Sequence, residues 1–232
     1  MEIKLKKKPQ KPVIIEGFPS LGLVGGIAAE FLVDYLNAEQ IGCLYSEKLP
    51  PVASIHNGQV LDAFGIFYNE KSNIVIIRPL TLAAGMEWEL SNSIVNLADI
   101  LKAKELISLE GINAGRGLAE PQAFFFTADK AKSKKLQSLG LTEIKEGLVF
   151  GVSASLLSKQ PESTFIFTET HSELPDSRSA AKMVEVLDKY LGLKIDYKPL
   201  IEKAEMFEKK LKGIMQAAQK SADKTQGTSY LG

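Results

Sequence analysis

Gly17-Phe-Pro-Ser-Leu-Gly-Leu-Val-Gly-Gly26 joins an apolar run, residues 13–15, to a helical pattern, residues 27–36. A strand, a glycine loop and a helix start in this order often direct backbone N–H groups at a phosphate. Dinucleotide loops need Gly-x-Gly-x-x-Gly, and P-loops need Lys and Ser or Thr after the last glycine. This loop has neither pattern, since Ile27-Ala28-Ala29 follow its glycines. The glycines therefore favour a tight turn with close helix-on-sheet packing over a nucleotide site.

The composition is that of an ordinary globular protein. The chain has 232 residues, of which 45% are hydrophobic and 24% are charged. Lys and Arg together number 28, as do Asp and Glu, so no global field selects nucleic acid as a partner. Neither a signal peptide nor an eighteen-residue apolar run is visible. We therefore expect a soluble cytoplasmic protein with no nucleic-acid or membrane partner.

Strand-like and helix-like segments alternate over most of the chain. This pattern predicts an α/β protein, a three-layer α/β/α sandwich spanning residues 1–196. The hairpin signal Asn57-Gly58 adds an antiparallel excursion, so the sheet is expected to be mixed but mostly parallel. The expected strands are 13–16, 40–45, 52–56, 60–68, 73–78, 105–110, 122–127, 147–150 and 164–170, and the expected helices are 22–37, 87–102, 130–139, 151–157 and 177–191.

The last segment has a different pattern. After Pro199, apolar residues follow the spacing of a heptad seam and predict an amphipathic helix over residues 197–221. This seam packs either on its own domain or on a neighbouring subunit, which makes it a candidate oligomerisation surface. Residues 222–232 are polar and predict a flexible tail, which ends in Tyr230-Leu231-Gly232. The seam consists of Leu200, Ala204, Phe207, Leu211, Ile214 and Ala218.

Few residues indicate chemistry. The two histidines, His56 and His171, lack the spacing of a metal site, and no motif indicates a cofactor or a catalytic residue. Two polar loops follow expected strands, and an enzyme could use them through Arg116 in one and His171 in the other. A structural interpretation of the second loop is that Asp176 or Ser177 caps the helix over residues 177–191. We favour the structural interpretation and a protein that is not an enzyme.

Three segments taken together resemble a known family. They are the loop from Gly17 to Gly25, Leu49-Pro50-Pro51 with the following Asn57-Gly58, and a stretch beginning Leu174-Pro175-Asp176. That stretch continues through Ala180-Ala181 to Leu191-Gly192-Leu193-Lys194-Ile195-Asp196. In order and spacing they resemble the PAC2 family of proteasome assembly chaperones, particularly its archaeal homologues. The resemblance implies a phosphorylase/hydrolase-like α/β/α sandwich without an active site, acting by protein contact.

The resemblance also implies a role for the tail. Some archaeal members and proteasome activators end in hydrophobic-Tyr-any residue, which enters pockets between α subunits of the 20S particle. Here Tyr230 is third from the end and Ser229 precedes it, so Tyr230 and Leu231 would fill the pocket while Gly232 supplies the carboxylate. We therefore expect an ATP-independent, homo-oligomeric chaperone or activator that binds proteasome α subunits. The alternatives are a nucleoside phosphorylase or hydrolase using Arg116 and His171, and a self-assembling scaffold that does not contact the proteasome.

Overall fold

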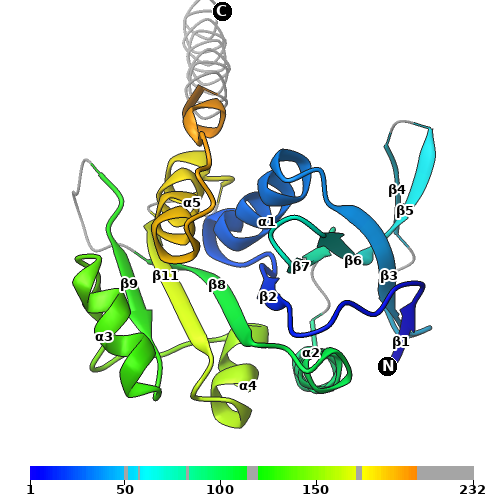
Figure 1. Cartoon of the computed structure of the whole chain (residues 1–232), viewed down its shortest axis with the longest axis horizontal. Helices are drawn as coiled ribbons and strands as arrows, with labels where there is room; N and C mark the ends of the chain where they lie inside the picture. Colours follow the sequence, from blue (N-terminus) through cyan, green and yellow to red (C-terminus); the bar gives the residue numbers. More distant parts are fainter. Residues whose placement is uncertain (50–51, 57, 82–83, 114–119, 171–173, 203–232) are drawn as a thin grey trace, which may run out of the picture.

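The computed structural model describes residues 1–49, 52–56, 58–81, 84–113, 120–170 and 174–202. Strands and helices alternate through these parts of the chain (Figure 1). The strands are β1 (Glu2–Leu5), β2 (Val13–Glu16), β3 (Glu39–Tyr45), β4 (Ala53–His56), β5 (Gln59–Asp62), β6 (Phe64–Asn69), β7 (Ile74–Pro79), β8 (Glu105–Asn113), β9 (Ala123–Phe126), β10 (Thr142–Glu143) and β11 (Thr164–Thr170). The helices are η1 (Leu21–Leu23), α1 (Val24–Tyr35), α2 (Glu87–Leu101), α3 (Lys130–Ser138), α4 (Gly151–Lys159) and α5 (Ser177–Leu191).

The main sheet is mixed, as the sequence predicted, with the strand order β1-β3-β6-β7-β2-β8-β11-β9-β10. Its centre is parallel, since β7, β2, β8 and β11 all run in one direction. On one side of the sheet β1, β3, β6 and β7 pair antiparallel, and a short turn joins β6 to β7. Within the described residues, the main sheet has four parallel and four antiparallel pairings, so the expected parallel majority holds only at the centre.

Helices cover both faces of this sheet and complete the predicted three layers. Helices α1 and α5 pack together on one face, and α2 and α4 pack together on the other (Figure 1). Side chains alternate along a strand, so neighbouring residues of β2 enter different layers. Ile15 packs in the layer with α1 and α5, whereas Ile14 packs with α2 and α4, and both are fully buried. The glycine loop therefore starts from a strand that is buried on both faces.

The hairpin of β4 and β5 stands apart from the main sheet (Figure 1). Its register pairs His56 with Gln59, which agrees with the hairpin that the sequence predicted here. Gly58 has a φ of 74°, a conformation that glycine adopts without strain. Ile55 and Val60 lie opposite each other and are 77% and 71% exposed. The hairpin thus presents an apolar pair to solvent.

The predicted bounds of β2, β11 and α5 are confirmed, but other segments differ. Residues 147–150 do not form the predicted strand, because Leu148 and Phe150 are largely exposed and Gly151 turns the chain into α4 with a φ of 71°. The segment 60–68 is divided between β5 and β6. Strand β1 was not predicted because it is rich in charge, yet it pairs with β3 at the edge of the sheet.

The end of the described chain tests only the start of the predicted C-terminal helix. Residues 198–202 are helical, and residues 203–221 of that predicted helix lie outside the described residues. The predicted tail, residues 222–232, also lies outside them. No helix in the part of the chain that the structure describes has the length and hydropathy that a membrane crossing requires.

Candidate functional site

The glycine loop lies at the carboxyl edge of the parallel strands, where ligand sites of wound α/β folds occur. Its glycines are required by close packing. A Cβ on Gly17 would lie 2.1 Å from the carbonyl oxygen of Gly25, and one on Gly25 would lie 2.4 Å from that of Leu109. Gly22 has a φ of 64°, and a Cβ there would lie 2.5 Å from Oγ1 of Thr170. These distances support the structural interpretation of the loop, with α1 held tightly against β8.

Asp176 joins the loop to α5. Its side chain caps α5 by accepting a hydrogen bond from the Ser179 N–H at 3.0 Å, and it also accepts from the hydroxyls of Thr170 and Ser179, both at 2.7 Å. Its own N–H donates to the carbonyl of Gly22 at 2.9 Å. The predicted capping role of Asp176 is therefore confirmed, and one residue connects β11, α5 and the glycine loop.

We expect Asp176→Ala to lower the free energy of unfolding by about 2 kcal/mol, because it removes the cap and two further hydrogen bonds. Asp129→Ala is the matched control, since Asp129 caps α3 with bonds only to the N–H groups of Ala131 and Lys132. Its expected cost is about 1 kcal/mol. Urea unfolding of both variants measures the difference, and an equal loss in both would contradict the joining role of Asp176.

A buried polar cluster lies beside the loop. Glu16, fully buried at the end of β2, accepts a hydrogen bond from the Phe18 N–H at 3.3 Å. On β8, Ser108 donates to the Ser153 hydroxyl at 3.0 Å, and Ser153 donates to Oε2 of Glu110 at 2.7 Å. Burial raises the pKa of Glu16 to about 8 and that of Glu110 to about 7. Two carboxyl groups can therefore hold protons near neutral pH.

This cluster was not predicted from the sequence. Glu16 and Glu110 each end an expected strand, and a charged residue closing a buried apolar run was the available signal. Among the described residues, no group of three or more His, Cys, Asp or Glu side chains is arranged to hold a metal ion.

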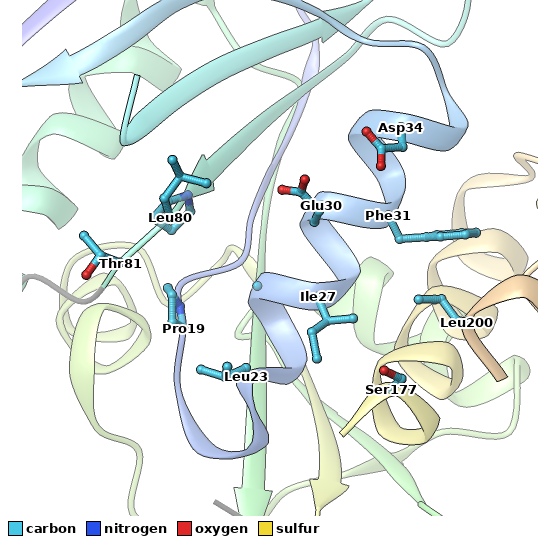
Figure 2. Close-up of a pocket in the computed structure, with 12 residues that line it drawn as sticks. Pro19, Leu23, Ile27, Glu30, Phe31, Asp34, Leu80, Thr81, Ser177 and Leu200 are labelled. Atoms are coloured by element: carbon cyan, nitrogen blue, oxygen red, sulfur yellow. The ribbon is translucent and has the colours of Figure 1, made fainter. Parts of the chain in front are cut away.

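A pocket lies along the outer surface of α1 (Figure 2). It has a volume of about 390 Å³ and lies between the glycine loop, the end of β7 and the first residues of α5. Glu30 on its wall accepts a hydrogen bond from the buried Arg78 at 2.6 Å. Figure 2 shows Leu200 across from Ile27 and Phe31 of α1. Leu200 is 2% exposed within the core of its own domain. Leu200, the first residue of the heptad seam, therefore packs on its own domain.

Most other residues singled out in the sequence lie outside the described residues. They are Arg116, His171, Ala204, Phe207, Leu211, Ile214, Ala218, Tyr230, Leu231 and Gly232. The strands that precede Arg116 and His171 are neighbours, since β8 and β11 pair in parallel and Asn113 lies opposite Thr170. The structure therefore places the starts of both polar loops together without describing the two side chains that the enzyme alternative needs.

The structure is that of a three-layer α/β protein. At the carboxyl edge of its parallel strands, hydrogen bonds within the chain hold the glycine loop that follows β2. The family model of the PAC2 family matches residues 14–215, and the chain belongs to this family.

Solved structures and sequence relatives agree with that assignment. A crystal structure of Pyrococcus furiosus PbaA, described as an archaeal homologue of proteasome-assembly chaperone, is 32% identical and covers 99% of each chain, with a TM-score of 0.85. The fold is also that of P. furiosus PbaB, described as an archaeal proteasome activator, at 22% identity, 92% and 98% coverage and a TM-score of 0.79. An uncharacterized protein of Methanocaldococcus jannaschii is 29% identical over 96% of this chain and 93% of its own.

Proposed function

We propose that this protein is an ATP-independent proteasome-assembly chaperone or activator that acts as a homo-oligomer. In this proposal Tyr230, Leu231 and Gly232 bind between α subunits of the 20S proteasome. The observation that carries it is the 32% identity to PbaA over 99% of both chains, because that protein is described as a homologue of proteasome-assembly chaperone. A cytoplasmic location stays a prediction.

Two features support action by protein contact. The first is the hairpin of β4 and β5, whose exposed Ile55 and Val60 form an apolar pair of the kind found at protein interfaces. The second is the heptad seam that begins at Leu200. The apolar spacing of its later residues is that of a helix that can pair with another copy. An oligomer would present several tails at once, and linked sites experience an effective concentration of roughly millimolar. Weak single contacts would then add up to stable binding.

The test is binding of the purified protein to immobilised 20S particles, with and without residues 228–232. We expect the deletion to reduce binding by at least about tenfold, because each tail contact that is lost also lowers the avidity. Tyr230→Ala should act in the same direction, and Thr228→Ala is the matched control, which should bind normally. Sedimentation of the truncated protein checks that the oligomer is retained.

Each part of the proposal can fail separately. Unchanged binding after deletion would rule out the tail mechanism while leaving proteasome contact intact. A protein that recovers only itself when mixed with α subunits would be a self-assembling scaffold. A monomer at micromolar concentration would contradict the oligomer.

A further inference from the structure

A pocket of about 500 Å³ opens beside the buried polar cluster, on the face of the sheet that α2 and α4 cover. The described residues that line it are the glycine loop from Phe18 to Leu21, Ala84, the start of α2, the end of β8, and residues 148–152 at the start of α4. Pockets of about 300–1,000 Å³ suit small molecules, and the carboxyl edge of parallel strands is where wound folds bind them. Its size and place are those of a ligand site.

The walls of the pocket are mainly apolar. Phe18 and Leu90 are buried core residues that reach it from the loop and from α2. Leu148 and Phe150 line it too, although they are 84% and 74% exposed. Two large apolar side chains at the edge of a hollow can close over an apolar ligand and gain by leaving water. The pocket therefore suits a body made of a ring or a branched chain.

The charged groups among its described lining residues have one sign. Glu110 and Glu87 contribute carboxyl groups, and none of these lining residues is Lys, Arg or His. Glu87 is held by the Gly85 N–H at 3.1 Å, and Glu110 by the Ser153 hydroxyl at 2.7 Å. The fully buried Glu16 behind Glu110 has a pKa raised to about 8 by burial, so it is mainly protonated near neutral pH and the negative charge at the pocket comes from Glu110 and Glu87. A phosphate or carboxylate would be repelled here, whereas a cation would be attracted.

We propose that this pocket binds a small organic amine, whose ammonium group pairs with Glu110 while its apolar body contacts Phe18, Leu90 and Phe150. The proposal is independent of proteasome binding, because none of its residues belongs to the C-terminal segment. It assigns the negative charge at the carboxyl edge to recognition, whereas the hydrogen bonds of Asp176 serve the fold. No reaction is implied.

Three probes that share a phenyl ring and a two-carbon chain test the assignment in full-length protein: phenethylamine, neutral 2-phenylethanol and anionic 3-phenylpropionate. Each probe is titrated into the protein, and the changes in amide NMR chemical shift give its dissociation constant. We expect phenethylamine to bind at least about tenfold more tightly than 2-phenylethanol, since a hydrogen bond to a charged group is worth that factor or more. We expect 3-phenylpropionate not to bind. Equal binding of the amine and the alcohol, or no shift with any probe, would overturn the proposal.

Two variants locate the site. Glu110→Gln should reduce the preference for the amine to less than about threefold, and Ala84→Trp, at an exposed lining position, should block all binding by filling the pocket. Glu146→Gln, an exposed carboxyl outside the pocket, is the matched control and should bind as the wild type does. If Glu110→Gln fails to fold, Ala84→Trp still decides, because amine binding that survives it is binding elsewhere.

Discussion

Gly25→Ala is expected to lower the free energy of unfolding by about 3 kcal/mol, because a Cβ at this position has no room. It would lie 2.4 Å from the carbonyl oxygen of Leu109, which is backbone of a central strand and cannot rotate away. Helix α1 would have to move off β8, and the core around Val24 and Ala28 would open. Urea unfolding followed by circular dichroism measures the loss.

The next residue provides the control. Gly26 lies in the same turn of α1, but a Cβ there would have its nearest neighbour 3.8 Å away. Gly26→Ala should therefore be neutral or stabilise the protein by about 0.5 kcal/mol, since alanine loses less backbone freedom on folding than glycine. Similar stabilities for the two variants would show that the close approach of α1 to β8 does not require Gly25.

Glu16→Gln is expected to remove much of the dependence of stability on pH. The pKa of Glu16 is about 8 in the folded protein and near its ordinary 4.5 when unfolded, so only the folded state holds this proton between those values. The contribution of Glu16 to the free energy of unfolding is complete below pH 4.5 and is lost as the pH rises through 8. Between pH 5 and pH 9 the wild type should lose about 4 kcal/mol from this group.

Unfolding at pH 5 is the reference for the comparison of the wild type with Glu16→Gln. At pH 5 the wild-type carboxyl is protonated and glutamine is close to it in shape, so the two proteins should unfold at similar urea concentrations. At pH 9 the variant should be the more stable, with the remaining slope due largely to Glu110, whose pKa of about 7 is also raised by burial. Equal slopes for wild type and variant would mean that Glu16 is not buried in its protonated form.

Much of the fold could be predicted from local pattern. Strands β2 and β11 and helix α5 begin and end at the predicted residues, because apolar runs and a capping Asp176 mark them clearly. The prediction of a strand at residues 147–150 was wrong. The apolar run Leu148-Val149-Phe150 is typical of a strand, but whether such a run is buried depends on the elements that pack against it, and Leu148 and Phe150 are exposed. The balance of parallel and antiparallel pairs could not be predicted either, because it depends on which distant strands become neighbours.

The site was less predictable than the fold. Capping by Asp176 follows from its place before an amphipathic helix, and this was recognised. The cluster of Glu16, Ser108, Ser153 and Glu110 joins three separate elements, so no spacing in the sequence indicates it. Raised pKa values come from burial and from charges brought together by folding, and neither exists in the extended chain.

The position of β2 at the centre of the sheet has a consequence for synthesis on the ribosome. Val13 of β2 pairs with Ile74 of β7 on one side and with Glu105 of β8 on the other. Strand β2 is therefore synthesised long before the two strands with which it pairs. Until then its apolar residues have no sheet to join, and pairings between distant segments form slowly. A protein of a chaperone-related family thus has a nascent chain that itself passes through an aggregation-prone interval, which ends only when β8 has left the exit tunnel.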